Sequence, residues 1–467
     1  MSIPRKEAGY RPVLERIYDF GEVEQTLNQE DRKLQASRCM DCGIPFCHWA
    51  CPLGNRMPEW QDLIYKGRWK EAIEILHETN NFPDFTGRIC PAPCEKSCVL
   101  NLSEVPVTIR ENEAAVTEVA FTEGMIKSRP PKIRTGKKVA VVGSGPAGLA
   151  AAQQLNRKGH TVTVFEKDNS IGGLLRYGIP NFKLNKNIID RRLAQLTEEG
   201  VIFKTNTEIG NTIAGAEVMK EYDAVCLSIG AGHPRDISPA GRDLKGIYFA
   251  MDFLSQQNQV IMEETMTISE RITAKDKHVL VIGGGDTGSD CVGTSIRQGA
   301  AKVTQIEILP KPPVGKNPAT PWPNYPNILK TSSSHQEGCE RKWSLNTLEF
   351  KGKNGQVKEV VVEEVEWKKD ENGRFTMIST GKTETIKADL VFLALGFIHP
   401  VHEGLLTELG VAYDSRGNVA VDKENQSSVS KVFAAGDAAM GASLVVRAIA
   451  SGRKAAEDIH HYLVQNL

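Results

Sequence analysis

Two glycine-rich turns constrain the fold of this 467-residue chain more than any other feature. Both have the spacing Gly-x-Gly-x-x-Gly, at residues 143–148 and 283–288, and both follow a run of apolar residues. A helical pattern and a second apolar run come next in each case. In this context the glycines permit a tight turn and a close approach of the backbone to a pyrophosphate. The sequence therefore predicts two strand–helix–strand units, each with a dinucleotide site.

An acidic residue stands where each site would hold a ribose. Glu166 and Glu307 lie about 20 residues beyond the last glycine of their units, which is the spacing typical of such sites. A carboxylate there accepts a hydrogen bond from a ribose 2′-hydroxyl but repels a 2′-phosphate. Glu307 therefore predicts a preference for NADH over NADPH. The alternative is that Glu307 points elsewhere and that Lys311, the nearest cation after it, accommodates the phosphate.

Seven of the ten cysteines form a separate block ahead of these units. They follow the patterns C-x2-C-x4-C-x3-C-P and C-x3-C-x3-C, and such short spacing suits a metal ion or an iron–sulfur cluster. An odd number of thiols excludes a fully paired disulfide framework, and the charged first residues lack the apolar stretch of a signal peptide. We therefore expect a cytoplasmic protein in which these cysteines are ligands: Cys39, Cys42, Cys47, Cys51, Cys90, Cys94 and Cys98.

The first run resembles the bacterial ferredoxin pattern C-x2-C-x2-C-x3-C-P, with a longer middle gap. In ferredoxins with two clusters, the fourth cysteine of the run ligates the other cluster. By this resemblance Cys51 crosses to a second [4Fe-4S] cluster and Cys98 crosses back to the first. The two expected sets are Cys39, Cys42, Cys47 and Cys98, and Cys51, Cys90 and Cys94, so the second set is one ligand short. A zinc site at the C-x2-C pair with nearby His48 is the competing interpretation.

Composition and patterning bound the rest of the chain. The 57 basic and 58 acidic residues give a formal net charge of -1, so no general field for nucleic acid or an anionic membrane is expected. No apolar run approaches the roughly 18 residues of a membrane span.

Apolar residues at three- and four-residue spacing predict one amphipathic helix over residues 59–79. Residues 128–138 predict a linker, 311–343 a long ordered loop or contact surface, and 360–378 a β-hairpin.

Two further motifs resemble flavoproteins that bind two dinucleotides. Residues 171–180 read Ile-Gly-Gly-Leu-Leu-Arg-Tyr-Gly-Ile-Pro, and residues 432–438 read Val-Phe-Ala-Ala-Gly-Asp-Ala. In that family the nicotinamide domain is inserted into the FAD domain. The resemblance implies an FAD site formed by Gly143, Gly145, Pro146, Ala147, Gly148, Glu166, Lys167, Gly173, Leu174, Gly436 and Asp437, and a nicotinamide site formed by Gly283, Gly285, Asp286, Thr287, Gly288 and Glu307.

Together with residues 39–51, 86–91 and 289–300, these motifs resemble the small (β) subunit family of glutamate synthase and its relatives in the N-terminal part of dihydropyrimidine dehydrogenase. The resemblance covers essentially the whole chain. It implies an α/β fold in which an N-terminal α-helical iron–sulfur domain precedes two Rossmann-like domains, the second inserted in the first. The expected bounds are 1–130 for the iron–sulfur domain, 131–250 and 396–467 for the FAD domain, and 251–395 for the NAD(P)H domain.

The resemblance also implies the activity of an electron-input subunit. NADH or NADPH would be oxidised by FAD, with no catalytic side chain required for hydride transfer. Two [4Fe-4S] clusters would pass the electrons to a large (α) subunit carrying FMN and a [3Fe-4S] cluster, which makes L-glutamate from L-glutamine and 2-oxoglutarate. The rival hypotheses are a related oxidoreductase subunit of a transhydrogenase, sulfide-linked, hydrogenase or formate dehydrogenase complex, and a zinc-stabilised interaction subunit with vestigial nucleotide folds.

The missing ligand of the second cluster is expected shortly after Cys98. Residues 107–113 resemble the segment that gives a carboxylate or amide ligand in related enzymes, and Glu113 matches that position best. Glu111 is the alternative, and an ordinary surface helix start is another. Glu113 is therefore the predicted eighth ligand.

Overall fold

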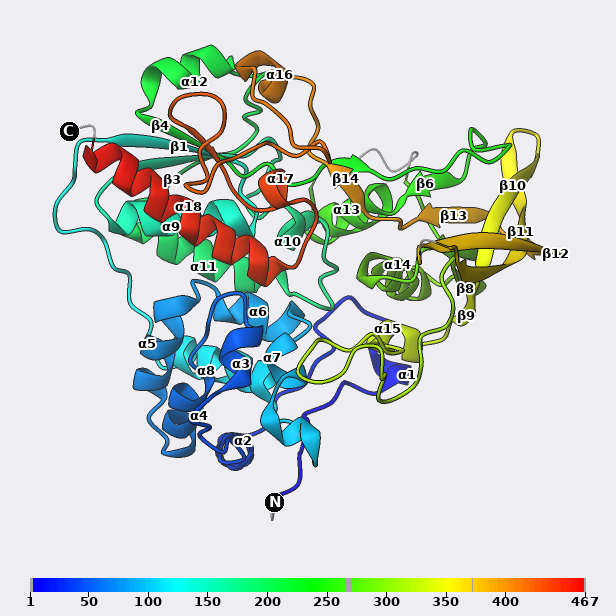
Figure 1. Ribbon diagram of the computed structural model, residues 1–467, viewed down its shortest axis with the longest axis horizontal. Coiled ribbons are helices and arrows are strands. Elements are labelled where there is room, and N and C mark those ends of the chain that lie inside the picture. The colour runs from blue at the N-terminus through cyan, green and yellow to red at the C-terminus, as the bar shows by residue number, and fades with distance from the viewer. Residues whose placement is uncertain (1–2, 265–270, 372, 466–467) are drawn as a thin grey trace.

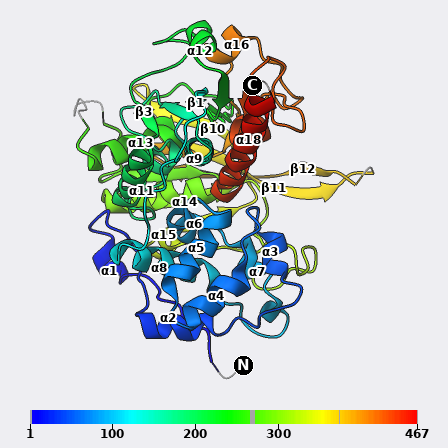
Figure 2. The same ribbon diagram turned by 90° about the vertical axis from the view of Figure 1, so that its left-hand side faces the viewer.

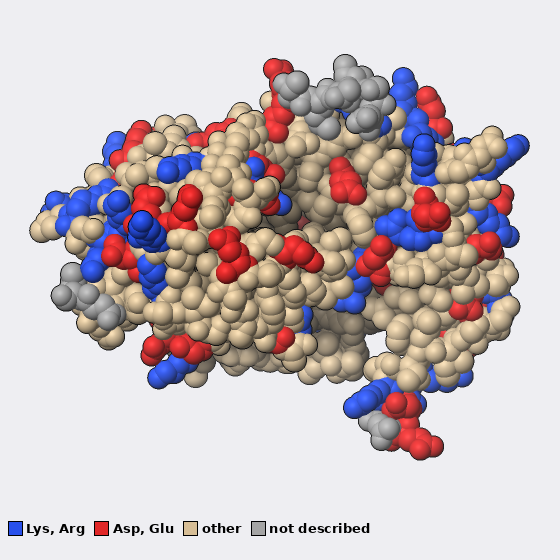
Figure 3. Space-filling model, turned by 90° about the horizontal axis from the view of Figure 1, so that it is seen from above, with Lys and Arg blue, Asp and Glu red and all other residues tan. Residues whose placement is uncertain are grey.

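The computed structural model describes residues 3–264, 271–371 and 373–465. An α-helical N-terminal part lies against two α/β parts, each built on a five-stranded sheet (Figures 1 and 2). Positive and negative side chains are interspersed over the face shown in Figure 3. None of the described helices combines the length and the apolar character needed to cross a membrane.

The helical part carries the cysteine runs on short helices and the turns between them. Its elements are α2 (Gln29–Ala36), α3 (Phe46–Ala50), α4 (Met57–Tyr65), α5 (Trp69–Thr79), α6 (Pro83–Ile89), α7 (Pro93–Lys96), η1 (Val99–Leu102) and α8 (Ile109–Thr122). The single helix predicted over residues 59–79 is wrong, because Gly67 at φ +71° separates α4 from α5. A left-handed glycine is a common helix terminator. The predicted apolar face nevertheless stays buried on both helices.

The first α/β part contains the first predicted unit, which is confirmed, in a parallel sheet of order β15-β4-β1-β2-β3. The chain leaves this sheet after β4 and returns near its C-terminus to add β15 and a long helix that packs on α9. The elements are β1 (Lys138–Val142), α9 (Pro146–Arg157), β2 (Thr161–Phe165), α10 (Leu174–Tyr177), α11 (Lys186–Glu199), β3 (Ile202–Lys204), α12 (Gly215–Glu221), β4 (Ala224–Leu227), α16 (Leu405–Leu409), β15 (Val432–Ala434), α17 (Asp437–Met440) and α18 (Val445–Gln465).

The second α/β part contains the second predicted unit, also confirmed, in a parallel sheet of order β6-β13-β7-β8-β9. A three-stranded antiparallel sheet, β10-β11-β12, includes the predicted hairpin, whose Asn372 lies outside the described residues. The elements are β6 (Ile247–Phe249), α13 (Ala250–Ile261), β7 (His278–Ile282), α14 (Asp286–Arg297), β8 (Lys302–Glu307), α15 (Ser333–Gln336), β9 (Glu340–Trp343), β10 (Leu345–Lys353), β11 (Gln356–Lys369), β12 (Phe375–Lys387) and β13 (Leu390–Leu393).

The chain passes between the two α/β parts twice, and the two crossings pair with each other. β5 (His233–Pro234) and β14 (Phe397–His399) form this short antiparallel ribbon. The predicted boundary at residue 250 falls too late, because β6 already pairs with β13 of the second sheet. Three residues at a sheet edge are too short a run for the sequence pattern to assign to one sheet or the other.

The N-terminal segment, residues 3–27, leaves the helical part and returns to it. Its helix α1 (Val13–Arg16) lies beside α15 of the second α/β part (Figures 1 and 2). The Arg16 guanidinium donates to the Ser333 carbonyl at 2.8 Å, and the Val23 amide donates to the Phe182 carbonyl of the first α/β part at 3.0 Å. Part of the predicted domain 1–130 therefore packs on both α/β parts.

Candidate functional site

The first glycine turn joins β1 to α9 and leaves open space at its middle glycine. A Cβ atom added at Gly143 would collide with the Ser228 carbonyl, and one added at Gly148 would collide with the Gly143 carbonyl. At Gly145, by contrast, no atom of the described residues lies within 4 Å of an added Cβ. The N–H groups at the start of α9 thus face a space into which a pyrophosphate fits.

Glu166, at the end of β2, is buried next to this turn. Its carboxylate accepts hydrogen bonds from the Ser144 amide at 3.2 Å and from the Asp168 amide at 3.0 Å. The predicted ribose acceptor is therefore held at the glycine turn. Ser144 was missed by sequence reasoning, because the variable second position of the motif carries no signal of its own. Lys167, the next residue, is exposed.

Two loops predicted to reach the flavin also meet this turn. An added Cβ at Gly173 would lie 3.1 Å from the Gly145 Cα atom, and Leu174 then begins α10. Gly436 is buried against Ala147, the second residue of α9, which starts at Pro146. Burial raises the pKa of Asp437 to about 6, although the Ser443 hydroxyl donates to its carboxylate at 2.9 Å. The structure thus brings the predicted flavin residues together.

The second glycine turn, between β7 and α14, repeats this geometry. An added Cβ would collide with the Ala394 carbonyl at Gly283 and with the Gly283 carbonyl at Gly288, whereas Gly285 again faces open space among the described residues. Asp286 and Thr287 form the first turn of α14. The Glu307 carboxylate accepts from the Gly284 amide at 2.6 Å and the Leu309 amide at 3.2 Å, so it points to the turn.

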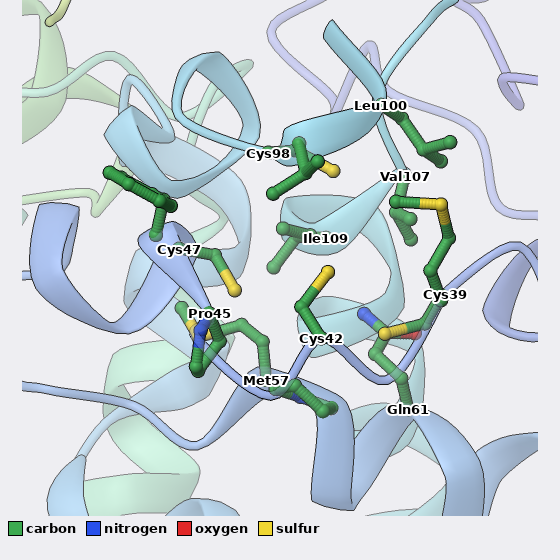
Figure 4. Close-up of a pocket in the computed structure, with 14 residues that line it drawn as sticks. Cys39, Cys42, Pro45, Cys47, Met57, Gln61, Cys98, Leu100, Val107 and Ile109 are labelled. Atoms are coloured by element: carbon green, nitrogen blue, oxygen red, sulfur yellow. The ribbon is translucent and has the colours of Figure 1, made fainter. Parts of the chain in front are cut away.

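Four cysteines from three separate segments line one pocket that is partly open to solvent (Figure 4). Cys39 and Cys42 precede α3, Cys47 lies within α3, and Cys98 follows α7. Burial, together with the neighbouring thiols, raises the pKa of Cys39 to about 11 and that of Cys47 to about 12. A positively charged metal centre would offset this cost, because it favours the thiolate form.

The other three cysteines lie together deeper in the helical part. Cys51 directly follows α3, Cys90 directly follows α6, and Cys94 lies in α7. Burial raises the pKa of each thiol, and the charge of Glu113 adds to the rise. Glu113 lies on α8, which packs on the helices α6 and α7. Cys98 lines the pocket together with Cys39, Cys42 and Cys47, and Cys51 does not line it, but the assignment of ligands to two clusters stays a prediction.

Glu113, on α8, is buried at the second set. Its Oε1 atom accepts from the Asn80 amide at 2.8 Å and from the Thr86 hydroxyl at 2.7 Å, and burial raises its pKa to about 7. Sequence reasoning missed Asn80 as a partner, because it lies 33 positions away in a segment without a motif. Glu111, the alternative ligand, is instead paired with the buried Arg32 guanidinium at 3.2 Å.

The second cysteine set lies next to the first α/β part. Phe82 and Phe85, at the start of α6, are buried in the core of that part, and the same helix ends at Cys90. Conversely, Val446 at the start of α18 is buried in the core that contains Cys51 and Cys94. The two cores meet without an intervening solvent layer.

Comparisons with known proteins agree with this arrangement. The family described as pyridine nucleotide-disulphide oxidoreductase matches residues 137–452, and the family described as dihydropyrimidine dehydrogenase domain II, 4Fe-4S cluster, matches residues 16–125. Among solved structures, Mycobacterium tuberculosis FprA in complex with NADPH superposes with a TM-score of 0.55 at 18% identity, covering 70% of this chain and 85% of that chain. That likeness concerns the fold.

Curated relatives match nearly the full length. A glutamate synthase [NADPH] small chain of Mycobacterium tuberculosis is 50% identical over 98% of this chain and 94% of the relative. The glutamate synthase [NADH] of Schizosaccharomyces pombe is 44% identical over 98% of this chain, which corresponds to 22% of that longer protein. On this identity and coverage, the chain belongs to the glutamate synthase small-chain family.

Proposed function

We propose that this chain is the electron-input subunit of glutamate synthase. It would bind NADH and FAD at the two glycine turns and hold two [4Fe-4S] clusters in the helical part. When bound, FAD would accept a hydride from the nicotinamide and release the electrons singly to the clusters. The partner would be a large subunit carrying FMN and a [3Fe-4S] cluster, which forms L-glutamate from L-glutamine and 2-oxoglutarate.

The observation that carries this proposal is the shared packing of the second cysteine set and the FAD-binding part. Helix α6 runs from the core of that part to Cys90, and the segment after Asp437 leads into the core around Cys94. Cys51 and Cys94 of the second set are buried and Cys90 is partly buried, whereas the pocket of the first set is partly open to solvent. We infer that electrons enter at the second set and leave at the first.

The proposed ligand sets follow from the grouping of the thiols. The first set would hold one cluster in the pocket of Figure 4, and the second set with Glu113 would hold the other.

The geometry gives no support to a zinc site. Among the described residues, no three His, Cys, Asp or Glu side chains are placed to bind one metal ion. A zinc site requires four ligands at about 2.0–2.3 Å from one point. His48 lies 3.5 Å from Glu59 and is absent from the lining of the pocket.

The proposal is tested by anaerobic purification from the source cell. We expect FAD, iron and acid-labile sulfide in the chain, and reduction of an artificial acceptor by NADH. Glutamate should form only when the large subunit is added. A colourless protein that contains zinc, or a copurifying large protein of a different complex, would refute the proposal.

Replacing Glu113 by alanine is expected to remove one cluster and leave the other. The second set would keep three ligands, because Glu113 is its only proposed non-cysteine ligand. The measurement is iron content together with electron paramagnetic resonance of the reduced protein. Glu111→Ala is the matched control, because Glu111 lies on the same helix α8 as Glu113 but pairs with Arg32 of α2. Two intact clusters in the Glu113 variant would show that the assignment is wrong.

We further propose that NADH is preferred to NADPH. The Glu307 carboxylate accepts from the Gly284 amide and so points to the ribose side of the turn, where it would repel a 2′-phosphate. The printed names of the relatives include both cofactors. Catalytic efficiency should be higher with NADH, and Glu307→Gln should narrow the difference. Higher efficiency with NADPH in the unaltered protein would contradict this preference.

A further inference from the structure

The long loop between β8 and α15 leaves the nicotinamide-binding part and reaches the helical part. In Figure 1 it extends from the side of α15 toward α7. Within it, the Trp322 indole N–H donates to the Cys98 carbonyl at 3.3 Å, and the Trp322 ring lies 4.7 Å from the ring of Phe46. The Ser97 hydroxyl donates to the Pro323 carbonyl at 2.7 Å. The loop therefore contacts the first cysteine pocket at Trp322 and Pro323. The expectation of a loop over all of residues 311–343 is wrong for its last part, which forms α15 and β9.

The loop has hydrogen bonds of its own that hold this position. The Asn317 side chain donates to the Asn327 carbonyl at 2.7 Å, and the Asn327 amide donates to the Thr320 hydroxyl at 2.9 Å. The Leu329 amide donates to the Pro313 carbonyl at 2.9 Å. These bonds tie the two arms of the loop together around Trp322, so the indole is presented on an ordered support.

Phe46 and Cys98, the two residues that Trp322 contacts, both line the first cysteine pocket. Trp322 is half-buried there, although it comes from a position 224 residues after Cys98. We propose that Trp322 is a positioning residue that shields the cluster in this pocket. The nicotinamide-binding part then completes the wall of a metal site whose ligands all belong to another part of the chain. This inference rests on the cluster proposed for that pocket.

The physical reason is solvent access. An indole packed on Phe46 covers apolar surface at the edge of the pocket, and its N–H group fixes the backbone of Cys98, a proposed ligand. Without the ring, water and dissolved oxygen would reach the cluster from that side. We therefore expect the cluster to be lost faster in air when the indole is removed, because dissolved oxygen can then oxidise its iron and sulfide.

The test compares three variants of the full chain purified anaerobically: Trp322→Ala, Trp322→Phe and Trp49→Ala. Trp49 is the matched control, because it lies in α3 next to the same pocket but its side chain is two-thirds exposed, at 67%. After exposure to air, the decay of the cluster absorbance and the release of iron are followed. FAD content and the thermal midpoint of each variant show whether its fold is intact.

We expect several-fold faster loss of one of the two clusters in Trp322→Ala, with FAD content and thermal midpoint unchanged. Trp322→Phe should decay close to the unaltered rate, since it keeps the ring, and Trp49→Ala should do the same. Equal decay in Trp322→Ala and the unaltered protein would overturn the inference. Absence of iron from the unaltered protein would instead refute the proposed function.

If Trp322→Ala loses its fold, Ser97→Ala is compared with the unaltered protein and Trp322→Phe, all purified anaerobically. The readout is again the decay of the cluster absorbance and the release of iron in air. Ser97→Ala removes the bond to Pro323, the residue after Trp322, so loss of one cluster is expected to be several-fold faster in that variant alone. An unchanged rate would contradict the shielding role.

Discussion

Gly145→Val is expected to give a folded protein that does not retain FAD. The backbone at Gly145 is extended, with φ -65° and ψ -179°, and valine adopts that conformation without strain. An added side chain meets no atom of the described protein within 4 Å of its Cβ, but it would fill the space through which a pyrophosphate approaches α9. Loss of two charge-assisted hydrogen bonds, at about 1.5–3 kcal/mol each, weakens binding at least about a hundredfold.

Flavin content after desalting, from the absorbance of released FAD, measures this effect. Gly285→Val is the matched variant, because Gly285 has the same open space and a similar extended backbone, with φ -80° and ψ -172°. That protein should keep FAD but lose reduction of the flavin by NADH. If Gly145→Val kept FAD and Gly285→Val lost it, the two glycine turns would have to exchange their assigned ligands.

Glu337→Ala is expected to destabilise the folded chain strongly. Glu337 is fully buried between two buried guanidinium groups, those of Arg16 and Arg297, and accepts hydrogen bonds from both. The Arg297 guanidinium also lies 3.8 Å from the ring of Phe182. Removing the carboxylate leaves two cations without their counter-ion in the core, and breaking a buried pair in this way costs about 3–5 kcal/mol.

Denaturant unfolding followed by circular dichroism and by flavin fluorescence measures this loss. The control is Asp19→Ala, which removes the ion pair of Asp19 with Arg11 in the same N-terminal segment. Both partners of that pair are partly exposed to water, with 29% of the Arg11 and 46% of the Asp19 side chain accessible, so its loss should change the unfolding free energy by no more than about 1 kcal/mol. If Glu337→Ala also changed the unfolding free energy by no more than about 1 kcal/mol, the buried ion pairs of Glu337 would add little to stability.

The parts of the structure that depend on local sequence could be predicted. The two strand–helix–strand units lie where the glycine spacing and the flanking apolar runs indicated, because a tight turn and two short segments fix each unit. The motif also led us to expect Cys98 beside Cys39, Cys42 and Cys47, whose pocket it lines, whereas the crossing of Cys51 to a second cluster stays a prediction. The break at Gly67 escaped local reasoning, because apolar periodicity continues across it.

Contacts between distant segments could not be predicted. Nothing in the sequence around Trp322 indicated that it would reach Cys98, and nothing near Arg16 indicated Glu337 as its partner. Such pairs depend on how whole sheets and helices pack, and a single chain offers no periodic signal for them. The same applies to β6, whose sheet is decided by pairing with β13 and not by its own three residues.

The path of the N-terminal segment has a consequence for the order in which the protein is completed during synthesis. Arg16 leaves the ribosome well before its partner Glu337, which lies 321 positions later. Parts of a chain fold as they emerge, generally from the N-terminus onward. The segment around Arg16 therefore cannot take its final place until residues 333–337 have been made, and its docking requires that all three parts have assembled.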